Sequence, residues 1–173
     1  MARFILRAVV GLLFMGHGLQ KLRGWFGGYG IEGTGQYFES IGLKPGRKHA
    51  TAAGVAETGG GALLTLGFLT PAAAAALIGV MATAIKTVHL EKGPWVSEGG
   101  WEYPAVIIAT LVALAEAGPG DLSLDRKLGT ELSGPTWAFL ALAAGLGGAA
   151  ANLASAGQAD GQETVATPPA DVR

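Results

Sequence analysis

Long stretches without charged residues alternate with short polar segments along the chain. Asp, Glu, Lys and Arg are all absent from residues 58–85 and again from residues 132–159. A helix of about 20 apolar residues crosses the ~30 Å of hydrocarbon in a bilayer. Two shorter uncharged stretches, 8–20 and 103–115, reach this length when the long charged side chains at their ends extend toward the membrane surface. The pattern is too apolar for a soluble helical bundle, and it predicts an integral membrane protein.

The same pattern and its turn residues predict five long helices. Pro71 suits the first turn of a helix, and Gly118-Pro119-Gly120 ends another helix. We therefore expect an all-α, polytopic membrane helix bundle. Its helices are expected at about residues 3–22, 48–69, 71–90, 101–117 and 135–154, with a short interfacial helix at 33–43 in the loop between the first two.

The chain divides into three expected regions. Residues 1–128 hold a four-helix membrane domain, residues 129–155 an additional hydrophobic helix, and residues 156–173 a disordered polar tail. The N-terminus has a basic start and an apolar run, which are also features of a signal peptide. We expect a retained helix instead, because its hydrophobic face continues to Leu22 and no soluble domain follows for export.

The composition narrows the function classes. Only 14% of the residues are charged, against about 25% in an average soluble domain. The net charge of -1 gives no electrostatic basis for binding nucleic acid. The absence of cysteine excludes structural disulfides, thiolate metal sites and a dithiol relay within this chain. We expect a multi-pass protein of a bacterial plasma membrane, in contact with the lipid bilayer.

Polar residues inside the expected helices gather at one end of the bundle. The candidate ligand-binding residues are His17, Lys21, Glu57, Lys86 and His89. His17 and Lys21 share a helix face at spacing i, i+4, and Lys86 and His89 share one at i, i+3. Glu57 lies deepest, about 13 Å along its helix from the end that bears the 23–47 loop. Both pairs are expected to turn toward Glu57, because an ionised carboxylate in hydrocarbon is costly unless it is paired.

Each of these residues also has a structural interpretation. Lys21 and Lys86 are long enough to extend to the membrane surface. His17 suits a satisfied histidine within the bundle, and His89 suits an ordinary residue of the membrane interface. Glu57 suits either a salt bridge between helices or a neutral hydrogen bond to His17. A functional pocket of this kind would bind the carbonyl of a quinone, relay protons, or bind a small acidic or amphipathic solute. A metal site is disfavoured, because no two histidines lie at i, i+4 with a carboxylate.

Three stretches of the sequence resemble the DoxX family of small membrane proteins. They are GLLFMGHGLQKL at 11–22, AETGGGALLTLGFLTPAAA at 56–74 and GPGDLSLDRKL at 118–128. The resemblance covers roughly residues 3–128 and implies a four-helix membrane protein. It also implies an association with quinone-linked oxidoreductases and with membrane complexes of oxidative-stress responses. The family-motif positions in this chain are His17, Lys21, Glu57 and Asp125.

We therefore expect the membrane subunit of an oxidoreductase or oxidative-stress complex that contacts quinone and has no cofactor built into the chain. Soluble redox enzymes or further copies of the chain are the expected partners. Two alternatives stay open: a small-solute or proton-coupled transporter, and a structural anchor for soluble redox enzymes. The membrane orientation also stays open, because basic residues flank both ends of the first helix.

Overall fold

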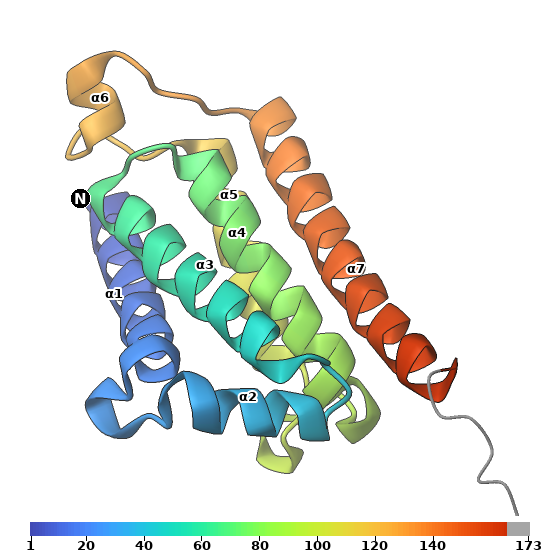
Figure 1. The fold of residues 1–173 in the computed structure, drawn as a ribbon. Helices are drawn as coiled ribbons and strands as arrows, with labels where there is room; N and C mark the ends of the chain where they lie inside the picture. Colours follow the sequence, from blue (N-terminus) through green and yellow to red (C-terminus); the bar gives the residue numbers. More distant parts are fainter. Residues whose placement is uncertain (166–173) are drawn as a thin grey trace, which may run out of the picture.

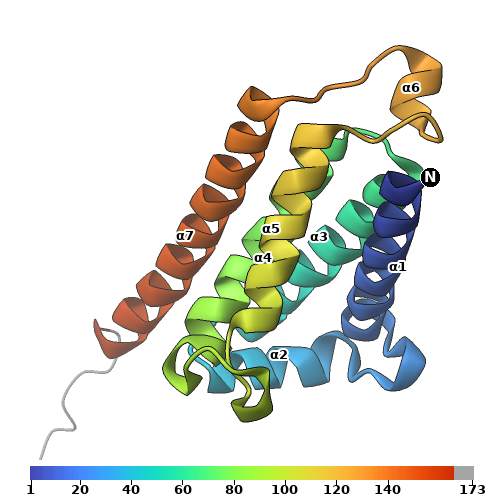
Figure 2. The same cartoon turned by 180° about the vertical axis from the view of Figure 1, so that it is seen from behind.

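Five long helices lie side by side in the computed structural model, which describes residues 1–165, with side chains as far as residue 157. The α4 helix packs against α3, α5 and α7, and α1 packs against α3 (Figure 1 and, from behind, Figure 2). This arrangement confirms the expected all-α membrane helix bundle. The bounds are α1 (Ala2–Arg23), α3 (Gly46–Leu66), α4 (Thr70–Ala84), α5 (Glu102–Ala117) and α7 (Pro135–Val165).

Short helices close the two ends of the bundle. The α2 helix (Gly30–Ser40) lies across the end where α1 finishes and α3 starts, called here the α2 end (Figure 1). The α6 helix (Leu124–Leu128) lies at the opposite end, called the α6 end. Beyond Ala84, α4 continues as a π-turn, Ile85–His89, and then a 3-10 turn, Leu90–Lys92. Two further 3-10 turns cover Trp25–Gly27 and Val96–Glu98.

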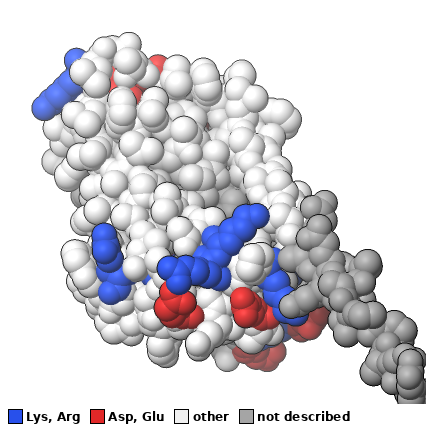
Figure 3. All heavy atoms as spheres, viewed as in Figure 1, with Lys and Arg blue, Asp and Glu red and all other residues white. Residues whose placement is uncertain are grey.

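Three stretches of the described chain are long and apolar enough to cross a membrane: Ala2–Arg23, Thr70–Lys92 and Pro135–Gly157. The α5 helix has only 16 residues, and α3 is less apolar than the three stretches, so neither belongs to this set. Both nevertheless run alongside the three spanning stretches (Figures 1 and 2). In Figure 3 the charged side chains gather toward the two ends of the molecule, with a broad uncharged zone between them.

Glycines bring α1 and α3 into close contact. A Cβ atom on Gly18 of α1 would lie 2.5 Å from the backbone nitrogen of Thr58, and one on Gly61 of α3 would lie 2.5 Å from the Gly11 carbonyl oxygen. Only residues without a side chain allow the two backbones to approach this closely, as is common between helices in membranes. The contact sets the register of α1 against α3 and so decides which of their polar side chains meet.

Buried charged side chains hold the α6 end together. Arg7 is fully buried and donates hydrogen bonds to the carbonyl oxygens of Leu64, Thr65 and Leu122, at 3.0, 2.9 and 2.6 Å. Asp125 is also fully buried and accepts hydrogen bonds from the backbone nitrogens of Leu69 and Thr70, at the start of α4. It therefore caps α4, whose first backbone N–H groups have no partner within the helix. These residues secure the turn between α3 and α4.

The C-terminal helix is longer than expected. The α7 helix continues to Val165, past residue 155, where the additional hydrophobic helix is expected to end. The part of the expected disordered tail at 156–165 is therefore helical: its two glycines, Gly157 and Gly161, do not end the helix, and no proline interrupts the chain before Pro168 and Pro169. The rest of the expected tail, residues 166–173, lies outside the described residues.

Candidate functional site

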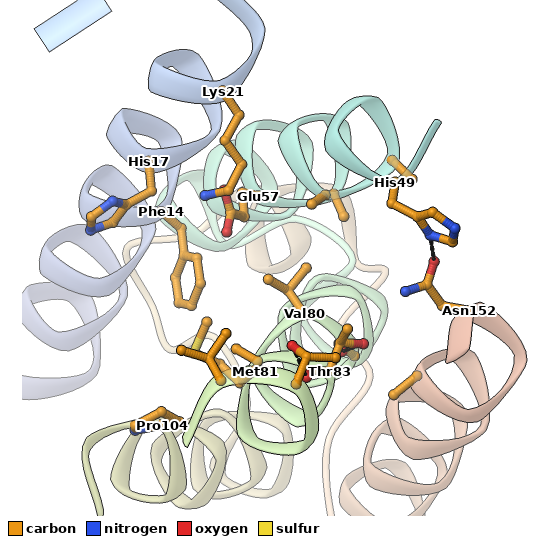
Figure 4. A pocket seen from close by; sticks show the side chains of 18 of the residues that line it. Phe14, His17, Lys21, His49, Glu57, Val80, Met81, Thr83, Pro104 and Asn152 are labelled. Carbon is orange, nitrogen blue, oxygen red and sulfur yellow. Dashed lines mark hydrogen bonds and ion pairs between the residues drawn. The ribbon is translucent and has the colours of Figure 1, made fainter. Parts of the chain in front are cut away.

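A cavity of about 690 Å³ lies inside the bundle, toward the α2 end. Its walls come from α1, α3, α4, α5 and α7, and residues of α2 and of the loop after it cover it. Apolar side chains such as Phe14, Val80 and Met81 form most of its surface (Figure 4). A cavity of this size and character is typical of small-molecule sites, which span ~300–1,000 Å³.

An ion pair lies on one wall of this cavity. Lys21 Nζ is 2.7 Å from Glu57 Oε2, and both side chains line the cavity (Figure 4). The Glu57 side chain is only 4% exposed and that of Lys21 is 21% exposed. The close approach of α1 and α3 at Gly18 places the two residues together. Of the two polar residues on α1 that were expected to meet Glu57, the structure therefore pairs it with Lys21 and not with His17.

His17 lies one turn before Lys21 on α1 and lines the same cavity. Its Nδ1 atom is 3.0 Å from Gln20 Oε1, and its side chain is exposed. His89 also lines the cavity, where its Nδ1 atom is 2.6 Å from the Gly99 carbonyl oxygen. Both histidines are thus held by neighbours outside the ion pair, and both remain beside the space in which a ligand would lie.

Lys86 does not line the cavity among the described residues, contrary to the expectation that it shares a face with His89. Its side chain is exposed. The reason is the π-turn at Ile85–His89, which contains both residues. A π-turn has i to i+5 hydrogen bonds and a wider turn than an α-helix, so residues three apart no longer stack on one face.

A second polar group, not expected from the sequence, lies on another wall. His49 Nδ1 is 2.8 Å from Asn152 Oδ1, and both residues line the cavity (Figure 4). His49 is 2% exposed and belongs to the first turn of α3. The preceding Arg47 and Lys48 are typical of a segment at the membrane surface, so nothing in the sequence indicated a buried histidine there. The sequence does contain a sign of Asn152, because it is a polar amide inside the long uncharged stretch 132–159.

The two polar groups lie at different depths in an otherwise apolar cavity. His49 and Glu57 are eight residues apart on α3, which corresponds to about 12 Å along the helix axis. Among the described residues, no group of three or more His, Cys, Asp or Glu side chains is placed to hold a metal ion. The arrangement suits an amphipathic organic molecule that has an apolar body and hydrogen-bonding groups.

Comparison with known proteins links this architecture to a family. The DoxX family model matches residues 2–90, which hold α1 to α4. The chain is 34% identical over 121 residues to "Putative oxidoreductase CatD" of Bacillus subtilis, covering 70% of this chain and 82% of that protein. It is 35% identical over 134 residues to "Uncharacterized membrane protein Rv3486" of Mycobacterium tuberculosis, covering 71% and 78% of the two chains. No solved structure matches the chain.

Proposed function

Because this chain belongs to the DoxX family and is an integral membrane protein, we propose that it is the membrane subunit of an oxidoreductase system and binds a quinone in its cavity. One relative is named "Putative oxidoreductase CatD", which supports an oxidoreductase role. The chain has no cysteine, and its described residues include no group of three or more side chains placed to hold a metal ion. In this proposal the electrons come from a partner enzyme. A bound quinone would supply the chemistry of accepting those electrons together with protons.

The Lys21–Glu57 ion pair within an apolar cavity is the observation that carries this proposal. A lysine ammonium has three N–H donors, and Glu57 accepts from only one of them in the observed contact. The remaining donors suit a quinone carbonyl oxygen, and the apolar walls suit the ring. Glu57 keeps the ammonium in place inside the membrane region, where a lone charge would be costly.

The α1 residues that line the cavity change from apolar to polar along the helix, as a quinone changes from its apolar tail to its polar ring. Val10, Phe14, His17 and Lys21 all line the cavity and recur at helical spacing on one face. The stripe is apolar toward the middle of the helix and polar toward the α2 end. A quinone placed along it would direct its polar ring toward the α2 end and its apolar tail toward the bilayer centre.

Gentle purification of the tagged full-length chain from its native membrane tests the proposal. We expect quinone in the solvent extract of the purified protein, together with a soluble redox enzyme identified by mass spectrometry. A matched control is the double variant Lys21→Met/Glu57→Leu, which removes both charges and keeps apolar side chains of similar size. We expect it to retain much less quinone. A bare homo-oligomer without quinone would contradict the proposal and favour the transporter.

A further inference from the structure

Asn152 is the only asparagine in the chain, and it lies on the cavity wall that α7 provides. This helix lies outside residues 2–90, which match the family model, so the wall is an addition to the matched part of the chain. In Figure 4 the side-chain oxygen of Asn152 points toward His49, and its amide nitrogen points toward the interior of the cavity. The cavity therefore has an N–H donor on the wall opposite Lys21.

His49 holds Asn152 in this orientation. Its Nδ1 atom is 2.8 Å from Asn152 Oδ1, and its Nε2 atom is 3.1 Å from the carbonyl oxygen of Lys44. His49 is 2% exposed, so the ring has little freedom to turn away. Both neighbours are oxygen acceptors, so the two contacts need an N–H on each ring nitrogen: Nδ1–H donates to Asn152 Oδ1, and Nε2–H donates to the Lys44 carbonyl oxygen. The oxygen end of the amide is then occupied, and its NH₂ end stays directed at the cavity.

We propose that Asn152 is a ligand-contacting residue that donates a hydrogen bond to an oxygen of the bound quinone, and that His49 is its positioning residue. A para-quinone carries one carbonyl on each side of its ring. Donors on opposite walls, Lys21 on α1 and Asn152 on α7, suit the two ends of such a ring (Figure 4). This inference rests on the proposed binding of a quinone in the same cavity.

A purely structural role of the His49–Asn152 bond would be to tie α7 to α3. The α4 helix packs against both of them, so the bond links two helices that share this neighbour. Loss of a tie of this kind would weaken the binding of any molecule that fills the cavity. Loss of a ligand contact would weaken only the binding of molecules that carry an oxygen acceptor, because a molecule without an acceptor has no hydrogen bond to Asn152 that could be lost.

Two probes of similar shape separate these roles: 2-methyl-1,4-naphthoquinone and 2-methylnaphthalene, which lacks the oxygens. Their affinities are measured by calorimetry on the purified full chain in lipid nanodiscs. We expect Asn152→Ala and the similarly sized Asn152→Leu to lower quinone affinity by roughly three- to tenfold, the usual range for one hydrogen bond. The affinity for 2-methylnaphthalene is expected not to fall, because this probe leaves the Asn152 N–H unmatched in the wild-type chain, and a retained affinity also shows that the cavity is intact.

The His49 variants test the positioning role. His49→Phe is expected to lower quinone affinity by about the same factor as Asn152→Ala, since the amide is then free to turn. His49→Gln is expected to restore most of the affinity, because its side-chain N–H is able to donate to Asn152 Oδ1.

The possible outcomes separate the inference from the proposed function. Unchanged quinone affinity in the Asn152 variants, or an equal loss for both probes, would overturn the role of Asn152 while leaving quinone binding in place. A wild-type chain that does not prefer the quinone to the hydrocarbon would overturn the proposed function itself, and the role of Asn152 with it.

Discussion

At the level of single residues, the two members of the central ion pair are buried to different extents. The Glu57 side chain is 4% exposed, whereas the Lys21 side chain is 21% exposed and lies nearer the α2 end. A flexible lysine is able to extend toward the membrane surface when its partner is lost, but a short carboxylate in the middle of α3 is not. The stability of the pair should therefore depend unequally on its two members.

We expect Lys21→Met to lower the free energy of unfolding by about 3–5 kcal/mol, because it leaves a buried carboxylate without a partner. Glu57→Gln should cost less, since the Lys21 ammonium is able to reach the surface. The double variant Lys21→Met/Glu57→Leu should regain most of the stability, because an apolar pair often replaces a buried ion pair without loss. Thermal unfolding in detergent measures all three. Equal losses of unfolding free energy in the two single variants would contradict the expectation that the more buried residue depends more on its partner.

Asp125, a motif position in the sequence resemblance, makes its contacts at the α6 end of the bundle. It accepts hydrogen bonds from the backbone at the start of α4 and from the Thr130 hydroxyl at 3.0 Å, all at the α6 end. We expect Asp125→Ala to lower stability by about 1–2 kcal/mol through loss of the helix cap. Quinone affinity should not change, because the cavity lies toward the α2 end. A loss of affinity at unchanged thermal stability would argue for a role of Asp125 at the site.

At the level of helices, the contact between α1 and α3 positions the ion pair. We expect Gly18→Val to lower the unfolding midpoint strongly, because overpacking of a tight contact typically costs about 1–3 kcal/mol. The matched control is Gly16→Val, two residues away on α1, where an added Cβ would meet no atom within 4 Å. Gly18→Val should also weaken quinone binding, since it separates Lys21 from Glu57. Equal effects of the two substitutions would show that helix propensity, and not the contact, decides the outcome.

Helix positions were largely predictable from the sequence, because uncharged stretches and turn residues mark where helices begin and end. The expected helices at 3–22 and 101–117 agree with α1 and α5 to within one residue at each end. The π-turn at Ile85–His89 was not predictable from hydrophobic spacing, which assumes the regular α-helical turn. That single irregularity explains why His89 lines the cavity and Lys86 does not.

At the level of the whole molecule, the cavity depends on which helices become neighbours. The spacing of polar residues within one helix predicts a shared face, but it does not predict which other helix that face meets. Lys21 and Glu57 were therefore predictable as candidates, whereas the His49–Asn152 pair joins residues 103 positions apart in the chain. The α7 helix, which provides one wall of the cavity, lies outside the residues that match the family model.

The central claim is that the cavity of the folded chain binds a quinone through its polar groups. The most direct measurement is a titration of the full chain in nanodiscs with 2-methyl-1,4-naphthoquinone, beside the variant Lys21→Met/Glu57→Leu. We expect the wild-type chain to bind the quinone at least about tenfold more tightly, as the loss of a hydrogen bond to a charged group implies. Equal affinity of the two folded proteins for the quinone would contradict the claim.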